Sequence, residues 1–118
     1  MGDDERLGRL LAAERTEAAE RIVSLTDDLD CMIQSSVGAN ADEEHDPDGA
    51  TIAFERAQLA ALLAASRRRL ADLDRAIVRL ADGTYGRCET CGQPIPADRL
   101  AARLTATACL RCVTTRRR

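Results

Sequence analysis

The chain has 118 residues and a net charge of −3, with one Phe, one Tyr and no Trp. So few large aromatic side chains exclude a large globular core, and the abundance of Ala, Leu, Arg, Asp and Glu is typical of long helices. The negative charge argues against a general attraction to nucleic acids or anionic membranes. No apolar stretch reaches the roughly 20 residues of a membrane-spanning helix, and the acidic N-terminus lacks the apolar segment of an export signal. We therefore expect a helical protein that is cytoplasmic and has a protein partner.

The first predicted helix covers about residues 3–37. Its apolar residues recur at steps of three, four and seven, which places them along one side of a helix. This stripe comprises Leu7, Leu11, Ala18, Ile22, Leu25, Leu29 and Met32. Gly38 is predicted to end the helix, because glycine readily adopts the left-handed conformation found at helix C-termini.

The second predicted helix covers about residues 50–82. Its seam alternates steps of four and three, as in a coiled coil, and comprises Leu59, Leu63, Ser66, Leu70, Leu73, Ile77 and Leu80. Asp46 with Pro47, or Asp48, is predicted to begin this helix and Gly83 to end it. Because only a short turn separates the two helices, antiparallel pairing buries both stripes. The sequence therefore predicts a mainly α fold, with a long antiparallel helical hairpin (coiled coil) over residues 1–82 and its tip at 38–50.

Four cysteines follow the hairpin in two Cys-x-x-Cys pairs, Cys88 with Cys91 and Cys109 with Cys112, separated by seventeen residues. This spacing is typical of a four-thiolate zinc site, in which the protein fills all four positions and the metal is structural. A redox dithiol and an iron–sulfur cluster are the alternatives. We predict one structural Zn²⁺ in a C-terminal four-cysteine zinc finger, within a segment of residues 83–118 that ends in a basic tail.

Two further residues with reactive side chains lie outside this cluster. Cys31 lies between seam positions of the first helix and is interpreted as an ordinary free thiol, with redox sensing as the alternative. His45 lies in the acidic tip, where a lone histidine is more often solvated than a ligand or a pH switch. Neither residue is needed to complete the metal site.

The finger resembles that of the DksA/TraR family. The resemblance rests on Tyr85, Gly86, the four cysteines, Gly92, Ile95, Arg99, Leu100, Ala102, Arg103 and Thr105, together with the preceding hairpin. It implies a factor that binds RNA polymerase directly, without contacting DNA, by inserting its coiled coil into the secondary channel to modulate transcription initiation. We expect a monomer with no reaction of its own, because no nucleophile, base and orienting group occur together.

The family's tip motif, Asp-x-x-Asp-x-Ala, matches the segment from His45 to Ala50. Asp48 and Ala50 agree with the motif, Asp46 adds a further carboxylate, and His45 replaces the first aspartate. Some family members also bind guanosine tetraphosphate through basic residues of the coiled coil and finger. Arg103 matches one of these, whereas Asp72 and Val113 occupy positions where the responsive members have Lys, so the resemblance implies weak or absent dependence on this alarmone.

Two other functions are compatible with parts of the sequence. A nucleic-acid-binding zinc finger would use Arg99, Arg103, Arg111 and the terminal arginines, and its DNA affinity would depend steeply on salt. Alternatively, the tip carboxylates would help to hold a metal ion in the polymerase active site and stimulate transcript cleavage. The acidic total charge and the lack of stacking aromatic residues argue against the first alternative.

Overall fold

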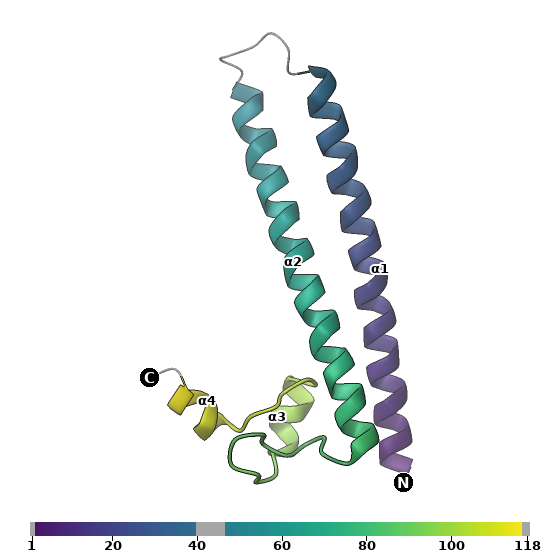
Figure 1. Ribbon diagram of the computed structural model, residues 1–118, viewed down its shortest axis with the longest axis vertical. Coiled ribbons are helices and arrows are strands. Elements are labelled where there is room, and N and C mark those ends of the chain that lie inside the picture. Colours follow the sequence, from purple (N-terminus) through teal and green to yellow (C-terminus); the bar gives the residue numbers. More distant parts are fainter. Residues whose placement is uncertain (1, 40–46, 117–118) are drawn as a thin grey trace. The chain divides into compact units, whose positions relative to one another are not determined.

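The computed structural model describes residues 2–39 and 47–116 (Figure 1). Two long helices, α1 (Gly2–Ala39) and α2 (Pro47–Asp82), form an antiparallel hairpin. Two short helices follow, α3 (Ala97–Ala102) and α4 (Leu110–Arg116). The described part of the chain contains no β-strand, only an isolated bridge between Arg87 and Pro94. The predicted fold class, a helical hairpin followed by a four-cysteine segment, is confirmed.

The first helix extends beyond its predicted end at Gly38, whereas the second begins at Pro47, one of its predicted starts. The first helix continues through Gly38 to Ala39, and the second begins at Pro47, so Asp48, Gly49 and Ala50 lie in its first turns rather than in a loop. Proline suits this position, because its fixed φ matches a helix and its missing N–H has no partner to lose in the first turn. His45 and Asp46 lie outside the described residues.

The chain packs as two compact units. The hairpin unit comprises Thr16–Leu70, and the finger unit comprises Met1–Arg15 together with Ala71–Arg118. In the hairpin unit, the buried side chains are Ala18, Leu25, Leu63 and Ser66. All of them belong to the two predicted stripes, so the heptad pattern correctly identifies the side of each helix that is buried in this unit.

The finger unit contains the first part of the α1 stripe and the last part of the α2 stripe. Leu11 and Leu73 are fully buried there, and the Cβ position of Gly8 lies 3.6 Å from Leu80 Cδ2, an ordinary packing contact between α1 and α2. Arg15 forms an ion pair with Asp74 on the surface of the same unit, where solvent weakens such pairs. The apolar contacts therefore provide most of the stabilisation of this helix pairing.

Within residues 2–39 and 47–116, no helix combines the length and the apolar character that crossing a membrane requires.

Replacing Leu73 by Ala should lower the free energy of unfolding by about 2 to 4 kcal/mol, because the substitution leaves a cavity at a side chain with no exposed surface. Urea unfolding followed by circular dichroism measures this change. Arg68→Ala, at an exposed position of the same helix, is the control and should change stability little. Equal losses in the two variants would show that the seam does not determine stability.

Candidate metal centre

The end of α2 turns the chain into the finger. Gly83 has a φ of 84°, in the left-handed region that favours glycine, and the backbone N–H groups of Thr84 and Tyr85 both donate to the carbonyl oxygen of Arg79, at 2.9 and 3.1 Å. The Arg79 guanidinium in turn donates to the carbonyl oxygens of Thr84 and Arg87. These bonds fix the direction in which the chain approaches Cys88.

The first cysteine pair lies in a tight backbone turn. The N–H of Cys88 donates to Gln93 O at 2.8 Å, and the N–H of Gly92 donates back to Cys88 O at 2.9 Å. Gly92 closes the turn with a φ of 76°, which few other residues adopt without strain. The turn places the sulfurs of Cys88 and Cys91 on the same side of the bend.

The second cysteine pair is brought to the first by hydrogen bonds between distant parts of the finger. The N–H of Glu89 donates to Thr107 O at 2.8 Å, and the side chain of Arg99 donates through Nε to Ala108 O at 3.0 Å. These contacts position the segment that enters α4, which carries Cys112. Cys109 immediately precedes that helix, and the N–H of Val113 donates to its carbonyl oxygen at 3.0 Å.

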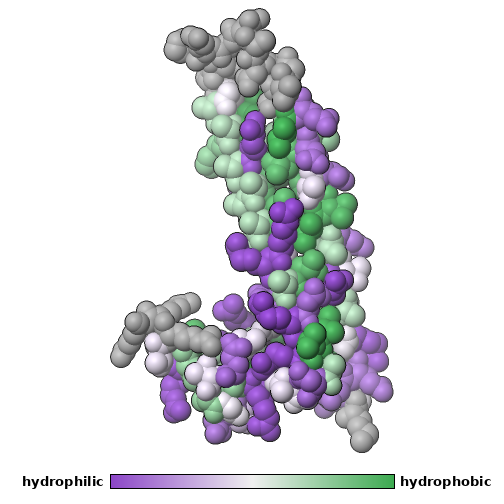
Figure 2. Space-filling view, in the orientation of Figure 1, coloured by the Kyte–Doolittle hydropathy of each residue, from purple (hydrophilic) through white to green (hydrophobic). Residues whose placement is uncertain are grey.

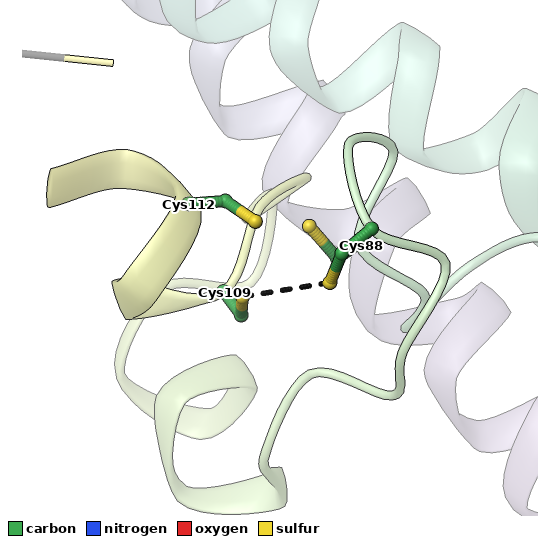
Figure 3. A group of neighbouring side chains, drawn as sticks. Cys88, Cys109 and Cys112 are labelled. Atoms are coloured by element: carbon green, nitrogen blue, oxygen red, sulfur yellow. Dashed lines mark hydrogen bonds between the residues drawn. The ribbon is translucent and has the colours of Figure 1, made fainter. Parts of the chain in front are cut away.

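The sulfur atoms of Cys88, Cys91, Cys109 and Cys112 all lie within 4.8 Å of one another. The sulfurs of Cys91 and Cys109 are 3.9 Å apart, close to the ~3.8 Å between ligands of a tetrahedron with Zn–S distances of about 2.3 Å. Figure 3 shows the side chains of Cys109 and Cys112 pointing toward Cys88 from the other side of the cluster. The four thiolates fit a single zinc ion.

Hydrogen bonds favour the thiolate form of two of the four cysteines, Cys88 and Cys109. The backbone N–H of Cys91, and then that of Cys109, lower the pKa of Cys88 to about 5. The pKa of Cys109 is also lowered, chiefly by the backbone N–H of Cys112. In contrast, hydrogen bonds with Cys109 and Cys88 raise the pKa of Cys112 to about 12, because its proton is shared with neighbouring sulfurs. A bound Zn²⁺ would replace this shared proton and favour the thiolate form of all four ligands.

The cluster is also the core of the finger. Cys88, Ile95, Ala108 and Cys112 are buried together, with Leu100, Cys109 and Val113 packed against them. The Tyr85 hydroxyl donates to Leu104 O at 2.7 Å and adds one further link across the finger. Since two of these four buried side chains belong to the cysteine cluster, a zinc ion bound there would have a structural role.

Comparisons with known proteins point to one family. The family model described as "Prokaryotic dksA/traR C4-type zinc finger" matches residues 83–116. The structure of transcription factor DksA2 from Pseudomonas aeruginosa superimposes with a TM-score of 0.78 at 27% identity, covering 99% of this chain and 84% of that one. The finger is thus of the DksA/TraR type, and the fold is like that of DksA2. This confirms the resemblance found in the sequence.

Curated relatives from the same comparisons match shorter segments. The RNA polymerase-binding transcription factor DksA of Caulobacter vibrioides is 49% identical over 41 residues, which is 35% of this chain and 29% of that protein. The uncharacterized protein YteA of Bacillus subtilis is 40% identical over 68 residues, or 58% of this chain and 28% of that protein. General stress protein 16O of the same bacterium is 36% identical over 64 residues, which is 54% of this chain and 39% of that protein. The matched segments thus span less than two fifths of these relatives.

The three positions that the sequence resemblance relates to alarmone binding line one cleft of the finger unit. Asp72, Arg103 and Val113 all border this cleft, which has a volume of about 780 Å³. Asp72 forms an ion pair with Arg75, which also lines the cleft. The carboxylate of Asp72 and the guanidinium of Arg103 therefore line the same cleft.

The cleft also contains residues that the sequence analysis did not assign to it. Arg79 and Arg99 line it, but both guanidinium groups already donate to backbone carbonyls of the finger. Glu89 adds a second acidic side chain, whose carboxylate accepts a hydrogen bond from Thr107 Oγ1 at 3.3 Å. The sequence signal that could have identified Arg79 is its position in the last turn of α2, where basic side chains interact favourably with the final carbonyl groups of a helix.

The other predicted residues that the structure describes belong to the hairpin unit. Ala50 is exposed on α2 in the hairpin unit, and Asp48 belongs to the first turn of the same helix. Cys31 is an exposed free cysteine on α1. It does not contribute to the metal cluster.

Purified protein should contain one zinc ion per chain, and Cys88→Ser should abolish binding, because three thiolates leave the tetrahedron incomplete. Removing zinc with a strong chelator should increase hydrogen exchange over residues 84–113, while the far-ultraviolet helix signal of α1 and α2 persists. Metal analysis and hydrogen-exchange mass spectrometry provide the two measurements.

Cys31→Ser is the matched control for the zinc prediction and should retain the metal, since Cys31 lies outside the cluster. Acid should release the metal, because protons compete for the thiolates and the favourable ionisation of Cys88 is lost as the pH falls through about 5. Full zinc content in Cys88→Ser, or a finger unchanged by chelation, would contradict the structural role.

Proposed function

We propose that this protein binds RNA polymerase directly and inserts the tip of its helical hairpin into the secondary channel to modulate transcription initiation. The observation that carries the proposal is the combination of fold and finger: the match to transcription factor DksA2 covers 99% of this chain. The relative from Caulobacter is named as an RNA polymerase-binding transcription factor, and it is 49% identical to this chain over the 41 matched residues. Binding to polymerase is therefore the function best supported for this chain.

The proposed working residues are Asp48 and Ala50, with Asp46 and His45 beside them. Asp48 and Ala50 lie two residues apart in the chain, at the start of α2. A carboxylate near the tip would act through its charge, and the small Ala50 through its shape. His45, in place of the family aspartate, would reduce the negative charge of the tip near neutral pH.

The protein acts in this proposal as a cytoplasmic, monomeric binding factor without a reaction of its own and without direct DNA contacts. Its four cysteines leave no ligand position for water or substrate on a tetrahedral zinc ion. The zinc finger supports the end of the hairpin that bears Arg79. A DNA affinity that falls steeply with salt would instead favour the nucleic-acid-binding alternative.

Regulation by guanosine tetraphosphate is proposed to be weak or absent. A polyphosphate entering the cleft would approach Arg103 but would also meet the carboxylates of Asp72 and Glu89. Arg75, Arg79 and Arg99 are already engaged in an ion pair or in backbone hydrogen bonds. Repulsion by the acids and the loss of these contacts both oppose phosphate binding.

Asp48→Asn should leave folding and polymerase binding intact but remove most of the effect on initiation, because it changes charge and little else at the tip. Ala50→Thr tests the same region by adding bulk at an exposed position. Both variants are compared with the parent in a purified transcription assay and in a binding assay with core RNA polymerase.

Asp30→Asn is the matched control for the tip variants, since Asp30 is an exposed carboxylate on α1, and it should regulate like the parent. If Asp48→Asn and Ala50→Thr also regulate like the parent, the tip has no part in the mechanism. If the parent does not bind polymerase, the proposed function itself is wrong.

Adding guanosine tetraphosphate should leave the regulatory effect of the parent unchanged. The double variant Asp72→Lys with Val113→Lys should gain a response, because it replaces a repulsive charge by two attractive ones in the cleft. Titration of guanosine tetraphosphate in the transcription assay measures the response of the parent and that of the double variant. Asp98→Lys, an exposed finger position outside the cleft, is the control and should gain none.

A further inference from the structure

The outer side of α2 in the hairpin unit is apolar, although no part of the described chain packs on it. Spacings of four, three, four and four residues place five exposed side chains on this side: Ala50, Phe54, Ala57, Ala61 and Ala65. We call this set the Phe54 face. Figure 2 shows weakly hydrophobic surface along the side of α2 that points away from α1 in this unit.

Phe54 is the feature of this face that the hairpin does not explain. It is the only Phe of the chain, and its side chain is 69% exposed. The seam residues Leu63 and Ser66 are buried on the opposite side of α2, so Phe54 adds nothing to their packing. Its helix propensity is also lower than that of the alanines around it. The helix would form at least as well with Ala at this position.

The composition of the face is that of a binding surface with one anchor. Aromatic side chains dominate the energetics of many interfaces when they enter a pocket of the partner, and small neighbours permit the close approach that this requires. Between residues 50 and 66 the charged side chains are Glu55 and Arg56, and neither shares the helical side of Phe54. A partner would therefore dock on this face without removing a charge from water.

The size of the face argues against a second copy of this chain as the partner. Residues 50–65 span roughly 24 Å of helix, and with a helix diameter of about 10 Å the face offers roughly 240 Å² per copy. Two copies would bury roughly 500 Å², far below the ~1,200 Å² of a small stable interface. The Phe54 face is large enough only as one part of a contact with a partner that also touches other sides of the hairpin.

We infer that Phe54 is an anchor through which the hairpin binds RNA polymerase, seated in an apolar pocket of the channel wall. This inference rests on the proposed function, because a channel is a partner that surrounds the inserted hairpin. Ala50 lies one helical turn before Phe54 on the same side of α2, so the anchor and the proposed tip are continuous. Seating Phe54 fixes the depth and rotation at which the tip residues are presented.

The test is the affinity of full-length protein for its cognate core RNA polymerase, measured by fluorescence anisotropy with an N-terminal label. Phe54→Ala should weaken binding at least about tenfold, as expected for an aromatic anchor. Phe54→Leu should recover part of the loss, since it restores apolar volume. The matched control is Val23→Ala, which truncates a side chain that is 61% exposed on α1 of the same unit, and it should bind like the parent.

The outcomes separate this inference from the proposed function. Parent protein that binds polymerase, with Phe54→Ala binding equally well, overturns the anchor and leaves the proposed function standing. Parent protein that does not bind polymerase overturns both. Analytical ultracentrifugation that finds a parent dimer, lost in Phe54→Ala, assigns the face to a second copy and also overturns the inference. Unchanged helix content and thermal stability of each variant show that the losses do not come from unfolding.

Discussion

Convergence of four cysteine sulfurs within 4.8 Å is the constraint on which the finger depends. The finger has few apolar side chains to bury, and two of the four in its core are themselves zinc ligands. Hydrogen bonds from backbone N–H groups favour ionisation of Cys88 and Cys109, but a proton remains shared at Cys112. The folded backbone thus prepares a site for a dication, and the metal in turn compensates for the small core.

The hairpin depends on apolar packing between its two helices, and its two ends have different roles. In the finger unit, Leu11 and Leu73 are fully buried and Arg79 bonds to the first residues of the finger. In the hairpin unit, the same two helices bury a narrow stripe and leave the outer side of α2 to solvent. A single heptad pattern therefore supports both a scaffold for the metal site and a surface available to a partner.

Sequence patterns predicted the two stripes and the four ligands because both depend on spacing along the chain. All predicted stripe residues are buried or half-buried, from Leu7 to Met32 in α1 and from Leu59 to Leu80 in α2. Ala76, which is 3% exposed, was not predicted because it lies beside the seam, in the finger unit. The first helix was predicted to end at Gly38 but ends at Ala39, since glycine permits a left-handed residue without requiring one. The carbonyl partners of Arg79 and Arg99 depend on the folded finger, and no spacing rule identifies them.

The three glycines of the finger with positive φ have a consequence for its chemistry. The φ values of Gly83, Gly86 and Gly92 are 84°, 85° and 76°. A Cβ atom would meet nothing within 4 Å at Gly83 or Gly92, and only Leu100 Cδ1, at 3.6 Å, at Gly86. These positions therefore require glycine because of their backbone conformation and not because of limited space. An L-residue would be strained at such a positive φ even with free space around it. In a chemically synthesised finger, the backbone at these positions is one that a D-amino acid adopts readily, so mirror-image alanine would restrict the unfolded chain where ordinary alanine would strain the folded one.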